Sequence, residues 1–147
     1  MTREEFEICL VSRKILYFPC IELNSPYPHY FICVFIDPSQ IVYMSCCTSQ
    51  FETVKRLIER KRYPEATLVY IPEADTDNPF NKPTYINCNE YFPFSIDELW
   101  DWYQGNVLTV IEDLLPLHSF EQILLGFHAS DVIEDEIKEQ LPSLDSL

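Results

Sequence analysis

Two polar side chains stand at the ends of two neighbouring apolar runs, where they could act on one substrate. His29 begins the run 29–36, and Thr48 ends the run 41–48. The residues between the runs, Asp37-Pro38-Ser39-Gln40, have the composition of a turn, so we expect an antiparallel hairpin that pairs His29 with Thr48. A histidine and a hydroxyl near a cation can move a proton and hold a phosphate during RNA strand cleavage. The alternative is that His29 is simply a polar residue at a strand end.

A helix is expected directly after Thr48. Ser49 and Glu52 have the spacing of a capping box, in which the hydroxyl and the carboxylate each bind a backbone N–H at the helix start. The free N–H groups and the positive dipole end of a helix suit a phosphate, which makes Ser49 a candidate phosphate ligand. The same pattern also fits an ordinary strand-to-helix junction without any ligand.

The expected helix has one apolar face and one strongly basic face. Apolar residues recur at helical spacing from Phe51, and Tyr63-Pro64 should end the helix. The basic residues are Lys55, Arg56, Arg60, Lys61 and Arg62. We assign Lys55, Arg56 and Arg60 to the phosphates of a bound RNA, because clusters of Lys and Arg attract a phosphate backbone. The alternative is a solvated face that forms ion pairs with the acidic C-terminal helices.

The charge of the chain is divided unevenly. The net charge is −14, but residues 1–62 hold eight Lys and Arg against seven Asp and Glu, whereas residues 63–147 hold two against seventeen. Uniform acidity would argue against a nucleic-acid ligand, since phosphates need cations. The uneven division leaves a basic face in the first segment and a region that repels RNA in the second.

The remaining polar residues do not follow a known metal or cofactor pattern. The acidic groups Asp75/Asp77 and Asp97/Glu98/Asp101 lack the spacing of a metal loop. The two glycines, Gly105 and Gly126, cannot form a glycine-rich phosphate loop. His118 and His128 are expected to be structural or exposed. We therefore expect neither a metal nor a cofactor.

The six cysteines lie mostly inside apolar runs, without Cys-x-x-Cys pairs. They are typical of reduced core thiols in a cytoplasmic protein rather than of a disulfide framework. The charged start of the chain does not resemble a secretory signal, and no apolar run reaches the length of a membrane span. A cytoplasmic protein without membrane contact is the expectation.

The element pattern predicts an α+β fold with a small, largely antiparallel, barrel-like sheet, one inserted helix and C-terminal helices. We expect one domain over 1–147, in which residues 1–94 are β-rich, residues 95–141 form an acidic helical region and residues 142–147 are a frayed tail. Strands are expected over 7–20, as one long strand or a pair, and over 29–36, 41–47, 66–71 and 84–89; helices are expected over 51–62, 95–103, 120–127 and 131–141, with 107–111 either strand or helix. Gly126 is a candidate helix end.

Aromatic residues are concentrated around the last expected strand. They are Tyr85, Tyr91, Phe92 and Phe94. Base stacking needs exposed rings beside cations, and Lys82 is the only cation near these rings in the sequence. Core packing is therefore the expectation for all four.

The order of these elements resembles the MazF/PemK-like toxins, which are small endoribonucleases of toxin–antitoxin modules. The resemblance covers about residues 27–89. It rests on the run His29-Tyr30-Phe31-Ile32-Cys33-Val34, the strand end Cys47-Thr48-Ser49-Gln50, and the later runs Thr67-Leu68-Val69-Tyr70-Ile71 and Thr84-Tyr85-Ile86-Asn87.

The resemblance implies an SH3-like barrel and metal-independent RNA cleavage through attack of the ribose 2′-hydroxyl. Thr48 fits the family's Thr or Ser, whereas Pro28-His29 stands where the family has an Arg, so His29 would replace it as acid or base, or the chain is a degenerate relative. The family also implies RNA, an antitoxin and a second copy of the chain as partners. The alternative is an acidic protein-binding module, immunity-like or antitoxin-like, that neutralises a basic partner.

Overall fold

The structure is a computed structural model that describes residues 1–20, 22–23, 25–73 and 80–147. The strands are β1 (Lys14–Phe18), β2 (His29–Ile36), β3 (Ile41–Thr48), β4 (Leu68–Ile71), β5 (Thr84–Asn87), β6 (Phe92–Ser95) and β7 (Thr109–Leu114). The helices are α1 (Arg3–Cys9), α2 (Phe51–Lys61), α3 (Ile96–Gln104), α4 (Leu117–Ala129) and α5 (Asp135–Gln140), with short 3-10 turns η1 (Glu65–Thr67) and η2 (Leu144–Ser146).

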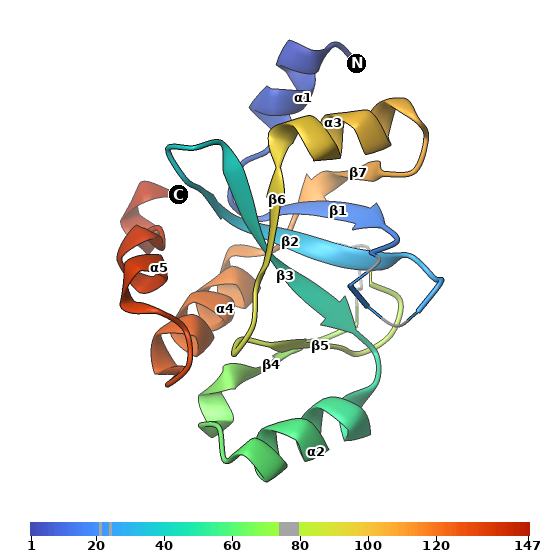
Figure 1. Ribbon diagram of the computed structural model, residues 1–147. Helices are drawn as coiled ribbons and strands as arrows, with labels where there is room; N and C mark the ends of the chain where they lie inside the picture. Colours follow the sequence, from blue (N-terminus) through green and yellow to red (C-terminus); the bar gives the residue numbers. More distant parts are fainter. Residues whose placement is uncertain (21, 24, 74–79) are drawn as a thin grey trace.

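The strands form one sheet of order β4-β5-β3-β2-β1-β7, in which β6 also pairs with β3 (Figure 1). Every pairing between the described strands is antiparallel. One edge of β3 pairs with β2, while its other edge pairs with β6 near its start and with β5 at its end. The α+β class and the mostly antiparallel sheet are therefore confirmed. Within the described ranges the sheet is open, with β4 and β7 at its two ends, so closure into a barrel stays a prediction.

The central strand β2 is buried on both faces, as its unbroken apolar run predicts. Ile32 and Val34 belong to one core cluster, and Phe31 and Cys33 belong to the other, because successive side chains point to opposite faces. Helices α4 and α5 cover the first face, and α1, α3 and β6 enclose the second (Figure 1).

Helix α2 lies against β5 and β4, apart from the other helices (Figure 1). It buries Val54 and Ile58 and ends at Arg62 in a left-handed conformation, close to the predicted end at Tyr63-Pro64. None of the helices in the described ranges has both the length and the apolar character needed to cross a lipid bilayer.

The N-terminal segment differs from the expected strand over 7–20. Residues 3–9 form α1 instead, because Thr2 and Glu5 make a capping box at its start and Phe6 is fully buried against α3. Only β1 remains of the predicted strand. The segment 107–111, expected as either strand or helix, belongs largely to strand β7. The expected division into a β-rich and a helical region is therefore incomplete, because the helix α1 lies in the first region and the strand β7 in the second.

The C-terminal helices also differ in their bounds from the prediction. Helix α4 starts three residues earlier than expected and continues through Gly126, which is buried, so this glycine does not end the helix. Helix α5 begins at Asp135 rather than at Asp131, because Ser130 to Glu134 form an irregular turn.

Candidate active site

The pairing of β2 with β3 brings His29 opposite Thr48. Phe31 is the partner of Cys46, and continuing this register by two residues gives the pair His29 and Thr48. Residues directly opposite each other in an antiparallel pair point to the same face of the sheet. The two side chains named by the sequence thus belong to one end of the sheet, although they are 19 positions apart in the chain.

A cavity of about 520 Å³ opens at this end of the sheet. We call it the sheet-end cavity. Its polar lining residues include Ser25, His29, Thr48, Ser49, Gln50 and Lys82, and its aromatic lining includes Tyr17, Tyr30 and Phe80. Gln50 is the N-cap of α2, so the positive dipole end of this helix lies at the cavity. The cavity therefore combines an imidazole, hydroxyls and a cation.

The hydrogen bond of His29 defines which ring nitrogen can act as a base. The ring Nδ1 lies 3.0 Å from the carbonyl oxygen of Tyr27. Because a carbonyl oxygen only accepts hydrogen bonds, Nδ1 must carry the proton in this contact. In the neutral ring, Nε2 then keeps its lone pair and can accept a proton from a ligand.

The Thr48 hydroxyl is held by the start of the helix that follows. Its Oγ1 accepts a hydrogen bond from the backbone N–H of Gln50 at 3.1 Å. The hydroxyl proton is left for donation, since the hydroxyl accepts through the oxygen in this contact. Thr48 is half-buried at the cavity, so its proton can be offered to a ligand oxygen.

The predicted capping box of Ser49 and Glu52 is wrong. Helix α2 starts at Phe51 with Gln50 as N-cap, and no side chain caps it. The box would require Ser49 as N-cap and a first helical residue at Gln50, whereas α2 has Gln50 as N-cap. The third helical position is therefore Thr53 rather than Glu52, and the spacing of the box is lost. Ser49 is exposed and lines the cavity, where its hydroxyl can reach a ligand.

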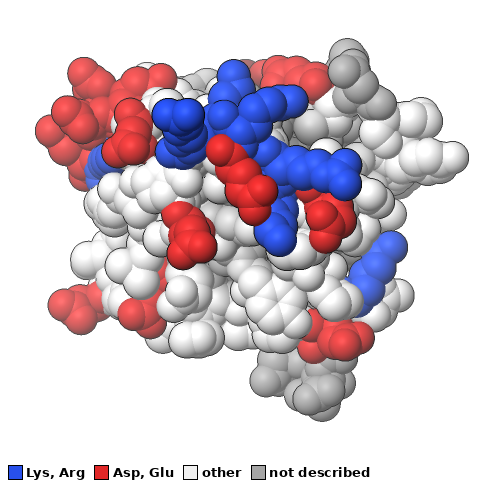
Figure 2. All heavy atoms as spheres, turned by 90° about the horizontal axis from the view of Figure 1, so that it is seen from below, with Lys and Arg blue, Asp and Glu red and all other residues white. Residues whose placement is uncertain are grey.

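The basic face of α2 is exposed but lies outside the cavity. Lys55, Arg56 and Arg60 are all exposed, and none of them lines the sheet-end cavity. Figure 2, which views the molecule from the side of α2, shows Lys and Arg gathered on this surface with Asp and Glu between them. Lys55 pairs with Glu59 at 4.0 Å. Within the described ranges no ion pair joins α2 to residues 131–139, so the expected pairing with the C-terminal helices is not found.

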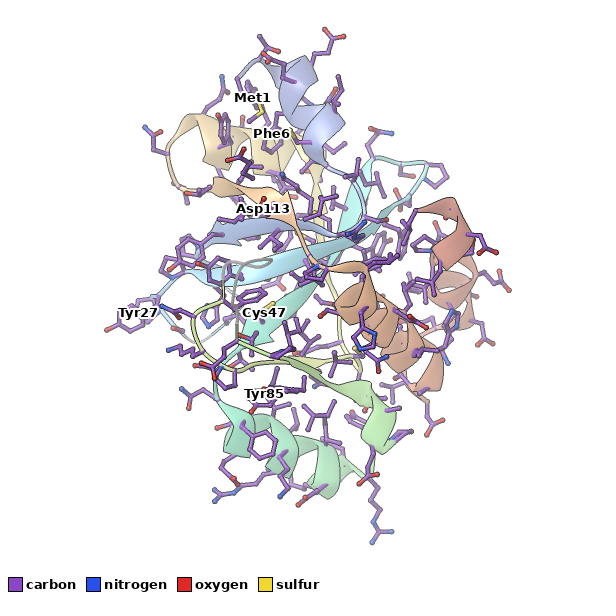
Figure 3. The ribbon with its side chains drawn as sticks, turned by 180° about the vertical axis from the view of Figure 1, so that it is seen from behind. Met1, Phe6, Tyr27, Cys47, Tyr85 and Asp113 are labelled. Atoms are coloured by element: carbon purple, nitrogen blue, oxygen red, sulfur yellow. The ribbon has the colours of Figure 1, made fainter. Side chains whose placement is uncertain are left out.

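A row of rings continues from Thr48 across the sheet. Tyr85 on β5 is the direct partner of Thr48, and Tyr70 on β4 is the direct partner of Tyr85. The ring centroids of Phe51 and Tyr85 are 4.8 Å apart, and those of Tyr85 and Tyr70 are 5.5 Å apart. Figure 3 shows Tyr85 between the sheet and α2. The Nζ of Lys55 lies 5.6 Å from the centroid of Phe51.

Tyr85 is half-buried and packs on Phe51, the ring over which Lys55 lies. The fold brings Lys55 to the ring cluster from a helix more than 20 positions earlier in the chain, which the local sequence around Tyr85 does not show. Core packing is confirmed for Phe92 and Phe94, which are buried. Tyr91 is half-buried and donates a hydrogen bond to Glu134.

Two residues near this end of the sheet were not predicted from the sequence: Lys82, which lines the cavity, and Tyr70, which belongs to the row of rings. Lys82 is one of only two Lys or Arg residues in 63–147, and it stands two positions before β5, the strand that pairs with Thr48. This isolated cation next to the strand was the feature of the sequence from which Lys82 could have been predicted. Tyr70 carries no comparable local signal, because its place beside Tyr85 depends on strand pairing.

The cysteines and other histidines do not contribute to the cavity chemistry. Burial raises the pKa of the Cys33 and Cys46 thiols to about 12 and that of Cys47 well above its ordinary value, so these thiols are poor nucleophiles. His118 and His128 are exposed on α4. The described residues contain no group of three or more His, Cys, Asp and Glu side chains placed to hold a metal ion, and Asp75 and Asp77 lie outside the described residues.

A second cavity, of about 690 Å³, lies beside α3 and β7. Its lining includes Met1, Trp100, Tyr103, Gln104 and Asn106. The described lining has no His, Lys, Arg, Asp or Glu side chain. The sheet-end cavity is smaller, but it is the better candidate for acid–base chemistry because it contains such side chains.

Comparison with known proteins does not assign a family to the chain. None of the known protein-family models matches it, and a search of curated proteins finds no significant match.

Proposed function

We propose that this protein is an endoribonuclease of the MazF/PemK-like toxin type that cleaves RNA without a metal ion. The observation that carries the proposal is the meeting of His29, Thr48 and Lys82 at one cavity. An imidazole with a free lone pair, a hydroxyl with a free proton and an ammonium group are the components that phosphodiester cleavage requires. The proposal includes the SH3-like barrel that the family resemblance implies.

The proposed reaction uses the RNA's own 2′-hydroxyl as nucleophile. Nε2 of His29 accepts the proton of the 2′-hydroxyl while the 2′-oxygen bonds to phosphorus. Thr48 donates a hydrogen bond to a non-bridging phosphate oxygen, and Lys82 and Ser49 hold the same phosphate. The bond from phosphorus to the 5′-oxygen breaks, and the leaving oxygen takes a proton from the imidazolium ion. The products are a 2′,3′-cyclic phosphate and a 5′-hydroxyl, and histidine returns to its neutral form.

The cations of α2 have a separate role in the proposal. Lys55, Arg56 and Arg60 bind phosphates of the strand beyond the cavity, since they are exposed along the helix whose start lies at the cavity. A single strand could then extend from the cavity along α2.

The proposal is tested by incubating the protein with mixed RNA in excess chelator. His29→Ala and Thr48→Ala are each expected to slow cleavage by about 100-fold or more, as is usual for loss of an acid–base group or a transition-state donor. His118→Ala and Thr53→Ala are matched controls, because both residues are exposed and outside the cavity. Equal survival of RNA with the wild type and with both active-site variants would remove the ribonuclease proposal.

A second candidate is an acidic module that binds a basic protein. The observation in its favour is the exposed acidic group Asp131, Glu134, Asp135, Glu136 and Glu139. Within the described residues none of these carboxylates forms an ion pair. This function predicts intact RNA in the assay above and salt-sensitive binding to a basic partner that is lost when these five residues are neutralised together.

A further inference from the structure

Four residues follow one another, strand by strand, across one face of the sheet, from the cavity to the basic helix. Thr48, Tyr85 and Tyr70 are direct partners across β3, β5 and β4, and His29 stands opposite Thr48 when the register of β2 and β3 is continued by two residues. Adjacent strands are about 4.8 Å apart, so the line spans about 14 Å. It connects the proposed chemistry at one end with an aromatic surface at the other.

The aromatic surface has an accessible ring. Tyr70 is 52% exposed, although it lies in a strand and contacts only the partly buried Tyr85 among the described rings. Phe51 completes the cluster from the helix side, and Lys55 lies over its ring. We call Phe51, Tyr70, Tyr85 and Lys55 the ring platform.

Packing of α2 against the sheet does not account for the whole platform. The helix packs through Val54 and Ile58, which are buried, whereas Tyr70 keeps half of its surface in solvent. Accessible rings and cations on one surface are the arrangement that binds bases of single-stranded nucleic acids, because every base has a π-face and every phosphate a negative charge. The exposed cations of α2 complement a polyanion.

We propose that the ring platform is a binding site for an unpaired base of single-stranded RNA, with Tyr70 as the stacking surface and Lys55 as a contact for the adjoining phosphate. This inference rests on the proposed function in one respect, the path of the bound RNA, which extends from the cavity toward β4. It assigns the platform to positioning the strand rather than to the reaction. A base paired in a duplex cannot stack on Tyr70, so the site selects single strands.

The test measures binding separately from cleavage. A fluorescent single-stranded RNA with 2′-O-methyl groups cannot be cleaved through 2′-hydroxyl attack, and its binding to the full chain is followed by anisotropy. Tyr70→Ala is expected to weaken binding about 5- to 100-fold, the usual range for loss of one stacked base, whereas Tyr70→Phe keeps the ring and should bind like the wild type. The duplex form of the same RNA is expected to bind more weakly than the single strand.

Lys55 is tested against a control on the same helix. Lys55→Gln and Lys61→Gln remove the same charge, but only Lys55 lies over the platform. A larger loss for Lys55→Gln supports the site, whereas equal losses mean that the helix acts only through its overall charge and overturn it.

Two results separate this inference from the proposed function. Cleavage of RNA by the wild type combined with unchanged binding by Tyr70→Ala overturns the platform and keeps the ribonuclease. Ring-dependent binding of the single strand without any cleavage supports the platform and overturns the ribonuclease. A chain that binds no RNA, but binds a basic protein, overturns both.

Discussion

Gly126 of α4 lies directly against Cys88, the residue that follows β5. A Cβ atom added at Gly126 would lie 2.7 Å from the Sγ of Cys88 and 3.1 Å from the backbone oxygen of Ala66. These distances leave no room for a methyl group, so a glycine at this position lets the helix approach the sheet. The close approach buries Phe127 and Ile123 in the core cluster on this face.

We predict that Gly126→Ala destabilises the protein by about 1–3 kcal/mol through overpacking, despite the higher helix propensity of alanine. Urea unfolding measures the change. Gly105→Ala is the matched control, since its added Cβ would meet its nearest neighbour at 3.4 Å, an ordinary contact, and its φ is negative. The control should be neutral or slightly stabilising. Equal stability of Gly126→Ala and the wild type would contradict the close packing.

The two predicted capping boxes give a second, paired prediction. At α3 the hydroxyl of Ser95 accepts the N–H of Glu98 at 3.1 Å, and the carboxylate of Glu98 accepts the N–H of Ser95. At α2 the corresponding serine, Ser49, does not cap the helix. Ser95→Ala should therefore cost about 1 kcal/mol of unfolding free energy, whereas Ser49→Ala should change it by less than about 0.5 kcal/mol. A similar loss in both variants would show that Ser49 does cap α2 in solution.

The comparison of these two boxes shows what local sequence can predict. Both have the same spacing, but the backbone after Thr48 turns through Ser49 before it becomes helical, because the Thr48 hydroxyl takes the first N–H. A pattern within four residues does not report that competition. Long apolar runs such as 29–36 are more reliable, since their burial on both faces leaves few other structures.

The candidate site also has a part that the sequence predicts and a part that only the structure shows. His29 and Thr48 can be brought together from sequence, because a short turn connects their strands. Their final register also depends on a bulge between Cys33 and Phe35, which the turn does not determine. Tyr70 reaches this face because β4 pairs with β5 and β5 pairs with β3. Lys82 precedes β5 and reaches the cavity with that strand, so both placements depend on contacts between distant segments of the chain. Their positions could be found only from the structure.

The buried cysteines predict how stability changes at alkaline pH. A thiol in the unfolded chain titrates near pH 8.5, whereas burial raises the pKa of Cys33 to about 12, with Lys14 opposing the shift. Between these two values the unfolded chain has released a proton that the folded chain still holds. The stability contribution is thus complete below about pH 8.5 and is lost as the pH rises, by up to about 1.4 kcal/mol per pH unit for each such thiol.

Cys33→Ala should reduce this slope, which urea unfolding at pH 8 to 10.5 measures. Val34→Ala is the control, because this neighbour is also buried but has no titratable group. The control should be less stable at every pH and keep the slope of the wild type. A Cys33→Ala slope as steep as that of Val34→Ala would mean that the thiol does not contribute.

Lys82 provides a prediction for the salt dependence of RNA binding. A lysine at the sheet-end cavity that contacts one phosphate releases one counterion when the strand binds. For a single strand, Lys82→Gln should therefore reduce the slope of log K against log salt concentration by about 0.7, in addition to weakening binding at low salt. Anisotropy titrations of the uncleavable RNA at several salt concentrations measure both quantities.

Lys138→Gln is the charge-matched control for Lys82. Lys138 donates to the backbone oxygens of His128 and Ser130, within the acidic C-terminal region and away from the cavity lining. The two variants have the same net charge, so a general effect of charge would change both slopes equally. A lower slope for Lys82→Gln alone locates the phosphate at the cavity, because counterion release depends on which cation contacts the strand and not on the total charge. Equal slopes would place the phosphate elsewhere on the protein and would exclude Lys82 from the site.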